Sequence, residues 1–270
     1  MKFGGRLAVI TGGASGIGLA LAHELGRAGS SVLIADQSQS AIDSALAKLS
    51  EAGVNADGAV CDVTNPESVD ALAEQAFGWK GRVDLLINNA GVSQKRAKLH
   101  EADLRDVRHV MDVNFWGVWH GCAAFAPRMA QQDHPSAIYN VGSENSLYCA
   151  VPRAAAYIAS KHAIIGLTDS FREDLPDHVH VGTIMPGWVA TGLTPSEVAH
   201  LAMSAEEFAR IIVPQILARE RYVVSHSYNA VRNAERHGAI ADCYARNVPR
   251  YDGDERYDVR ILIDRQRNSK

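Results

Sequence analysis

Tyr157 and Lys161 are the two residues whose types and spacing suggest proton transfer. They stand four positions apart at the start of a segment with helical periodicity, which places both side chains on one helix face, about 5–6 Å apart at Cβ. A phenol has an ordinary pKa of about 10, and a nearby ammonium stabilises its phenolate. Many exposed helices contain such a pair, so its meaning depends on the rest of the chain.

A glycine-rich turn lies between the first apolar run and the amphipathic segment Leu19–Ala28. Glycines permit a tight turn, and the N–H groups and positive end of the following helix attract a pyrophosphate. A turn needed only for packing is the alternative interpretation. The context of strand, turn and helix favours a dinucleotide site, with these residues as its candidates: Gly12, Ser15, Gly16, Ile17 and Gly18.

Asp36 closes the second apolar run, at the offset where a carboxylate meets the ribose hydroxyls of a dinucleotide. A 2′-phosphate would face this negative charge. Gln37 follows it, and the glycine turn offers no cation, so we expect NAD as the cofactor in preference to NADP. An acidic residue that merely ends a strand is the alternative.

Further motifs follow in a fixed order between residue 7 and about residue 194. They are Thr11–Gly18, Cys61-Asp62-Val63, Asn88-Asn89-Ala90-Gly91, Asn114, Ser143, Tyr157 with Lys161, and Pro186-Gly187 with Thr191. Together they resemble the short-chain dehydrogenase/reductase family. The resemblance implies further cofactor contacts, to the adenine, the cleft and the nicotinamide, from Asp62, Val63, Asn89, Ala90, Gly91, Tyr157, Lys161, Pro186, Gly187, Val189 and Thr191.

The same resemblance implies a catalytic set of Asn114, Ser143, Tyr157 and Lys161. Tyr157 accepts the alcohol proton while the hydride moves to the nicotinamide, or donates a proton in reduction. Ser143 binds the substrate oxygen, where charge develops. Lys161 lowers the pKa of Tyr157 and binds the nicotinamide ribose, and Asn114 supports a water chain from Lys161.

Substrate contacts are expected from the residues that flank this set, Ser143, Asn145, Tyr148 and Trp188, and from a lid over about residues 192–216. The mixture of polar and aromatic residues suits a secondary alcohol or ketone that is cyclic or carries an aromatic group. Glu144 is either a contact to a polar substituent or a solvated loop carboxylate. The alternative function is a catalytically silent regulatory protein that binds a dinucleotide.

Apolar runs alternate with helical patterns along the chain, which predicts an α/β fold with a Rossmann-like, doubly wound parallel sheet in a single domain over residues 1–270 and a core at 5–226. The predicted strands are Leu7–Thr11, Ser31–Asp36, Asp57–Cys61, Val83–Asn88, Ser136–Val141, Val179–Met185 and Tyr222–His226. Residues 228–270 depart from the usual family ending, as a charged helix to Arg246 and a polar tail. A homo-oligomer, dimer or tetramer, is expected through helices at Val107–Gln132 and Ala155–Leu175.

Composition narrows the remaining classes of function. The 270 residues are 47% hydrophobic and 21% charged with a net charge of −4, which suits a globular protein that binds a small molecule and argues against nucleic acid as a partner. No apolar run is long enough to cross a membrane, and Met1–Gly4 leads into a strand without a signal sequence, so a cytoplasmic location is expected. The four cysteines and the histidines, His162 and His226 among them, lack metal-ligand spacing, and we expect no catalytic metal.

Overall fold

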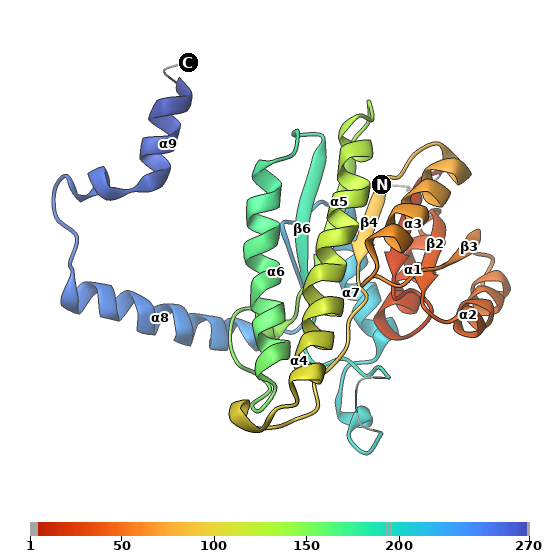
Figure 1. Cartoon of the computed structure of the whole chain (residues 1–270), viewed down its shortest axis with the longest axis horizontal. Coiled ribbons are helices and arrows are strands. Elements are labelled where there is room, and N and C mark those ends of the chain that lie inside the picture. Colours follow the sequence, from red (N-terminus) through yellow and green to blue (C-terminus); the bar gives the residue numbers. More distant parts are fainter. Residues whose placement is uncertain (1–4, 193, 195, 269–270) are drawn as a thin grey trace. The chain divides into compact units, whose positions relative to one another are not determined.

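The structure is a computed structural model that describes residues 5–192, 194 and 196–268 (Figure 1). Within these residues one sheet contains β1 Leu7–Thr11, β2 Ser31–Asp36, β3 Ala56–Val60, β4 Leu85–Asn88, β5 Ser136–Val141, β6 Val179–Met185 and β7 Tyr222–Val224. The strand order is β3-β2-β1-β4-β5-β6-β7, and all neighbours pair in parallel. The predicted α/β class and doubly wound parallel sheet are confirmed.

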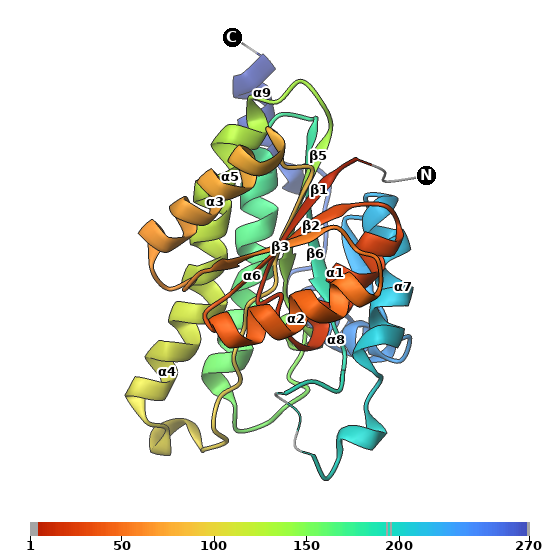
Figure 2. The same ribbon diagram turned by 90° about the vertical axis from the view of Figure 1, so that its right-hand side faces the viewer.

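Helices cover both faces of the sheet, and Figure 2 shows them as two layers. One layer contains α1 Gly16–Arg27, α2 Gln39–Glu51 and α7 Ala205–Leu217; the other contains α3 Pro66–Lys80, α5 Gly117–Ala130 and α6 Ala155–Glu173. Helix α4, Leu104–Met111, packs on α6. Along β1, Ala8 and Ile10 face the first layer, whereas Leu7 and Val9 face the second. Because both faces are covered, the strand is a continuous apolar run.

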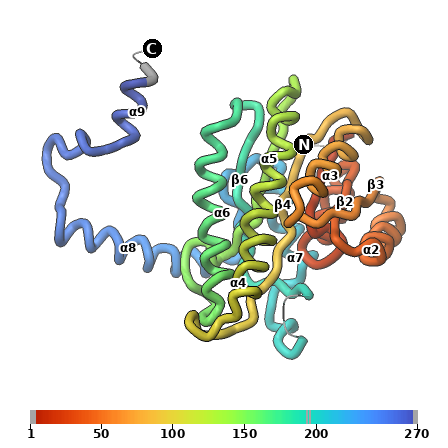
Figure 3. The backbone as a smooth tube through the Cα atoms, viewed as in Figure 1, coloured from red at the N-terminus to blue at the C-terminus, as the bar shows by residue number. Residues whose placement is uncertain are grey.

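The strand order reverses between β1 and β4. The chain runs outward from β1 to β3, then returns to add β4 on the other side of β1. In the red-to-orange part of the tube in Figure 3, β2 and β3 lie to the right of β4. In such sheets a crevice opens beyond the carboxyl ends of the two strands at the reversal. Here those ends are Thr11 and Asn88, which lead into the glycine turn and the Asn89–Gly91 motif.

Two predicted strand ends are wrong by two residues. The strand β4 begins at Leu85 instead of Val83, because the Val83 N–H donates to Gln132 Oε1 at 2.9 Å, outside the sheet. The strand β7 ends at Val224 instead of His226, whose ring turns toward the carbonyl of Trp188.

Helix α7 lies within the predicted lid over residues 192–216. Its residues Phe208, Ala209 and Ile212 are fully buried, and α7 packs against α1 as part of the core. This burial argues against α7 as part of a segment that orders only over substrate, and the lid over residues 192–216 stays a prediction. Within that range Leu193 and Pro195 lie outside the described residues.

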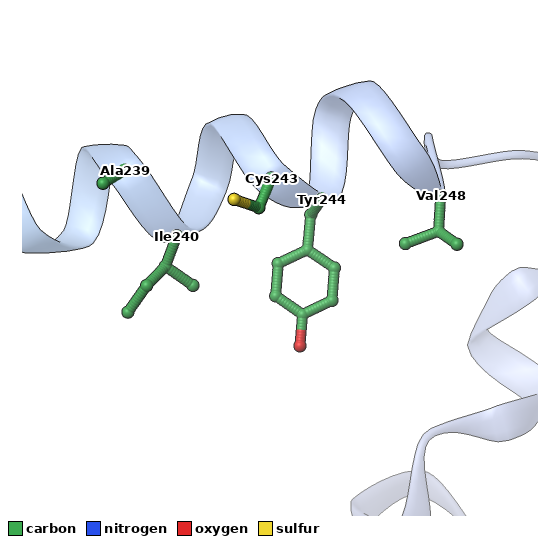
Figure 4. A pocket seen from close by; sticks show the side chains of 5 residues that line it. All are labelled: Ala239, Ile240, Cys243, Tyr244 and Val248. Carbon is green, nitrogen blue, oxygen red and sulfur yellow. The ribbon is translucent and has the colours of Figure 1, made fainter.

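The chain forms two compact units, and the boundary between them in the sequence lies after Ser227. The whole sheet lies in the first unit. The second unit contains α8 Asn229–Asn247 and α9 Val259–Asn268. The helix predicted from residue 228 is confirmed as α8, whereas α9 lies in what was predicted to be a polar tail. Figure 4 shows Ile240, Tyr244 and Val248 projecting from one side of α8 beside a shallow apolar pocket.

Among the described residues, no helix is both long enough and apolar enough to cross a membrane. The same residues contain no cluster of three or more histidine, cysteine or carboxylate side chains with the geometry of a metal site.

Candidate active site

The glycine turn between β1 and α1 adopts a backbone that only glycines fit. Gly12 and Gly16 have φ values of 61° and 51°, in the left-handed region. A side chain at Gly18 would collide with the carbonyl oxygen of Gly12. Ser15, the N-cap residue of α1, forms no side-chain hydrogen bond to the first turn, which leaves the helix N-terminus available to an anion.

Thr11 and Asn89 join the ends of β1 and β4. The Thr11 hydroxyl accepts hydrogen bonds from the N–H groups of Asn89 and Ala90, at 3.0 and 3.1 Å. In return the Asn89 side chain donates to the carbonyls of Thr11 and Gly12, at 2.9 and 3.1 Å. Sequence reasoning quoted Thr11 without assigning it a role, although a hydroxyl at a strand end before a glycine turn is a usable signal.

The other predicted cofactor residues surround this junction. The Asp36 carboxylate, at the end of β2, faces the glycine turn and accepts the Ala14 N–H at 3.4 Å. Val63 is buried, whereas Asp62 is exposed and its carboxylate accepts the N–H and hydroxyl of Thr64. A Cβ built on Gly16 would lie 3.3 Å from Thr191, so Thr191 reaches the turn from the far side of the crevice.

The segment after β6 is fixed at several points. The Pro186 carbonyl accepts the Glu144 N–H at 2.7 Å, and Val189, 6% exposed, pairs with Met203 in an isolated bridge. Gly187 contacts the His226 ring so closely that any side chain would collide with it. His226 Nε2 lies 3.2 Å from the Trp188 carbonyl. This contact gives His226 a structural role beside the segment after β6.

Lys161 is almost completely buried and lies on α6, about one turn after Tyr157. Its ammonium donates to the Val141 carbonyl at 2.9 Å and lies 5.9 Å from the centre of the Tyr157 ring. Burial lowers the pKa of Lys161 to about 8. A Cβ built on Gly91 would lie 3.6 Å from this nitrogen, an ordinary contact distance, so the Asn89–Gly91 motif lies directly beside Lys161.

The pKa of Tyr157 differs from the expectation that Lys161 lowers it. In the chain alone the pKa of Tyr157 is raised, because burial disfavours the phenolate; a hydrogen bond with Ser143 lowers it, and the nearby Glu144 carboxylate raises it. The Lys161 ammonium is itself desolvated and directed at a backbone carbonyl. Its charge therefore contributes less than a simple pairing on a helix face suggests.

Ser143 follows β5 and begins a short 3₁₀ helix, Glu144–Ser146. Its hydroxyl accepts the backbone and side-chain N–H groups of Asn145, at 3.1 and 3.3 Å. The Ser146 hydroxyl accepts the Ser143 N–H and donates to the Lys161 carbonyl at 2.6 Å, which connects the 3₁₀ helix to α6. Sequence reasoning missed Ser146, since nothing in its spacing distinguishes it from other loop serines.

Asn114 is fully buried in a π-helical segment, Asp112–Trp116, that continues α4 into α5. Its amide exchanges hydrogen bonds with the backbone N–H and carbonyl of Val92, at 2.8 and 3.0 Å. It also donates to the Ser160 hydroxyl at 3.2 Å, and this hydroxyl donates to the Tyr157 carbonyl. Asn114 thus holds α6 and the loop after β4 together.

Besides Ser143, the predicted substrate contacts Asn145, Tyr148 and Trp188 differ in accessibility. Trp188 is 44% exposed at the surface, and the Tyr148 hydroxyl donates to the Glu144 carboxylate at 3.1 Å. Asn145 is only 2% exposed, and its side-chain oxygen accepts the N–H groups of Ala150 and Val151. Its amide therefore shapes the loop and orients Ser143.

The comparisons with known proteins agree with this geometry. A family described as short chain dehydrogenase matches residues 6–202. The chain belongs to this family. Its members are oxidoreductases, and this short-chain dehydrogenase acts on CH–OH groups of hydroxylated substrates.

Relatives with assigned substrates match most of the chain. The 1-deoxy-11-beta-hydroxypentalenate dehydrogenase of Streptomyces exfoliatus is 36% identical over 84% of this chain and 85% of its own length. The cis-4-hydroxycyclohexanecarboxylate dehydrogenase of Sinomonas cyclohexanicum is 34% identical over 80% of this chain and 87% of its own. Among solved structures, a short-chain dehydrogenase/reductase from Burkholderia phymatum in complex with NAD superposes with a TM-score of 0.83, 30% identity and coverage of 90% and 96% of the two chains.

Proposed function

We propose that this short-chain dehydrogenase uses NAD to oxidise a cyclic or aromatic-bearing secondary alcohol, or to reduce the corresponding ketone, with Tyr157 as the general acid/base. The observation that carries the proposal is the convergence of Ser143, Tyr157 and Lys161 at the carboxyl ends of the strands, next to the glycine turn. When bound, NAD supplies the hydride acceptor or donor.

The residues around the crevice fit a dinucleotide. The glycine turn lets a pyrophosphate approach the backbone, and Asn89 to Gly91 line the opposite wall. The half-buried Asp36 carboxylate, held toward this turn by the Ala14 N–H, suits ribose hydroxyls and repels a 2′-phosphate. This is the argument for NAD over NADP. Val189 and Thr191 are the residues we assign to the nicotinamide end, and Asp62 and Val63 to the adenine.

The chain's own residues supply the proton chemistry. In oxidation the substrate hydroxyl transfers its proton to the Tyr157 oxygen, while the Ser143 hydroxyl holds the substrate oxygen in place. Protonated Lys161 stabilises negative charge on the phenol. The Lys161 pKa of about 8 leaves a large fraction of this amine protonated near neutral pH. Asn114 fixes the backbone around Tyr157 through Ser160. The reverse steps reduce a ketone.

The substrate class follows from the relatives and from the surface beside Ser143. Both relatives named above act on hydroxylated rings, as their names state. In this chain the exposed Trp188 and half-buried Tyr148 provide aromatic surface for a ring. The catalytically silent alternative has no observation in its favour, because the four candidate catalytic residues are all present and close together.

A homo-oligomer is part of the proposal. Trp116 and Trp119, before and within α5, are 45% and 46% exposed, with ring centres 5.7 Å apart. Neighbouring aromatic side chains on a surface are typical of a protein–protein contact. We therefore propose that a second copy of the chain covers this face, as expected from the sequence for the segment Val107–Gln132.

NADH absorbance across a panel of cyclic and aromatic secondary alcohols tests the activity. We expect turnover by the unaltered protein, and a loss of at least ~100-fold in kcat for Tyr157→Phe, the usual contribution of a general acid/base. NAD binding, measured by calorimetry, should stay within about threefold. Turnover by Tyr157→Phe at the normal rate would refute the assignment of Tyr157, and NAD binding without turnover on any compound would favour the silent protein.

A further inference from the structure

Helix α6 carries Tyr157 in its first turn but has no cap of its own. Its N-cap residue is Ala154, which has no side chain able to accept a hydrogen bond. The first N–H groups of any α-helix lack partners within the helix and need an acceptor from elsewhere. In α6 two of these groups belong to Ala156 and to Tyr157 itself.

Gln94 provides the missing acceptor from a distant part of the chain. Its side-chain oxygen accepts the N–H of Ala156 at 2.8 Å and the N–H of Tyr157 at 3.3 Å, across 62 and 63 residues of sequence. Gln94 is 5% exposed, so water competes little for these hydrogen bonds. A neutral amide oxygen therefore replaces the usual serine or aspartate cap.

The loop that carries Gln94 is itself held against α6. Val92 exchanges two hydrogen bonds with the Asn114 side chain, and the Ala97 N–H donates to the Arg153 carbonyl at 2.9 Å. Arg153 has a φ of 66°, a left-handed conformation that a non-glycine residue adopts only where its surroundings impose it. The loop over residues 92–97 thus fixes both the chain entering α6 and the first turn.

Hydrogen bonds hold the Tyr157 backbone from both sides. The Tyr157 N–H donates to Gln94, and the Tyr157 carbonyl accepts the Ser160 hydroxyl at 2.8 Å. The same loop begins at Gly91, which lies next to the Lys161 ammonium. A shift of Gln94 would therefore displace the Tyr157 backbone, to which it is bonded.

We infer that Gln94 is a positioning residue for Tyr157, which caps α6 through space and holds the phenol at the distance that proton transfer requires. The inference rests on the proposed function for its kinetic consequence, whereas the cap itself can be measured without turnover. Misplacement of a reacting group by about 1 Å costs on the order of 100-fold in rate. Loss of the cap should consequently lower kcat while leaving the distant adenosine contacts unchanged.

Two variants separate the hydrogen bond from the packing. Gln94→Met keeps the length of the side chain and removes the acceptor. Gln94→Glu keeps the acceptor and adds a negative charge at the positive end of α6, close to Tyr157, which raises the pKa of the phenol. Gln132→Met is the matched control, because Gln132 also binds a backbone N–H, that of Val83, away from the site.

The measurements are kcat and KM for NAD and an alcohol from the panel, the pH profile of oxidation, and hydrogen–deuterium exchange of the peptide at residues 154–158. For Gln94→Met we expect a fall in kcat of at least ~10-fold, KM for NAD within about twofold, and at least ~10-fold faster exchange of this peptide. For Gln94→Glu we expect normal protection of the peptide and a rise of the oxidation rate at higher pH than in the unaltered protein. Gln132→Met should leave all three unchanged.

Each result decides the inference. Unchanged exchange at residues 154–158 in Gln94→Met overturns it, even if the unaltered protein proves to be inactive and the proposed function fails. Unchanged kcat in a variant with faster exchange also overturns the positioning role. If Gln94→Met does not fold, Gln94→Glu decides alone, since an unmoved pH profile would contradict the placement of Gln94 beside Tyr157.

Discussion

At the scale of the residue, we propose that the carboxylate of Asp36 decides between NAD and NADP. We expect Asp36→Ala with Gln37→Arg to raise the ratio of kcat/KM for NADP to that for NAD by at least ~10-fold, which corresponds to about 1.4 kcal/mol. The removed charge repels a 2′-phosphate and the new arginine binds one. Steady-state kinetics with both cofactors provide the measurement, with Asp57→Ala on the neighbouring strand β3 as the control. An unchanged ratio would contradict the assignment of Asp36.

A second prediction at this scale concerns Glu144, whose carboxylate raises the pKa of Tyr157 in addition to the larger effect of burial. Oxidation needs the phenolate, so its rate rises as the pH passes through this pKa. Glu144→Gln removes the negative charge, lowers the pKa and should move that rise to lower pH. The pH profile of alcohol oxidation measures the shift. Glu74→Gln on α3 should leave the profile in place, and no shift in Glu144→Gln would place Glu144 among the solvated loop carboxylates.

At the scale of the element, the stability of two α7 variants tests whether α7 is a core helix or part of the predicted lid. Phe208 is fully buried against the sheet, whereas Ile211 on the same helix is 37% exposed. We expect Phe208→Ala to lower the free energy of unfolding by about 3–5 kcal/mol, and Ile211→Ala by no more than about 1 kcal/mol. Urea denaturation followed by circular dichroism compares the two. Equal, small losses would return α7 to the predicted lid.

Strands and helices differed in how far the sequence could predict them. The apolar runs of β1 and β2 are so continuous that their ends were predicted to the residue, because burial on both faces leaves little ambiguity. The π-helical turn around Asn114 and the burial of α7 depend on tertiary packing that no local pattern expresses. The cap on α6 was missed for the same reason, since Gln94 lies 62 residues before the N–H group to which it binds.

At the scale of the whole molecule, the exposed aromatic face at α5 predicts self-association. Light scattering after gel filtration should give a multiple of the 29.2 kDa chain mass, and Trp116→Glu with Trp119→Glu should reduce it to that of one chain. Val60→Glu, at an exposed apolar residue of β3, is the control and should leave the mass unchanged. A single-chain mass for the unaltered protein would refute the oligomer.

The junction of Thr11 with Asn89 joins distant parts of the chain, so it can form only late in synthesis. Its hydrogen bonds span 78 residues, and β4 is synthesised only after β1, β2 and β3 are complete. A nascent chain that ends at β3 has the glycine turn without the Asn89–Gly91 wall of the proposed dinucleotide site. Long-range parallel pairing is slow to form, and domains assemble during synthesis from the N-terminus. We therefore expect a dinucleotide to stabilise this protein only after the β1–β4 pairing has formed, so that cofactor binding follows the joining of the two halves of the sheet.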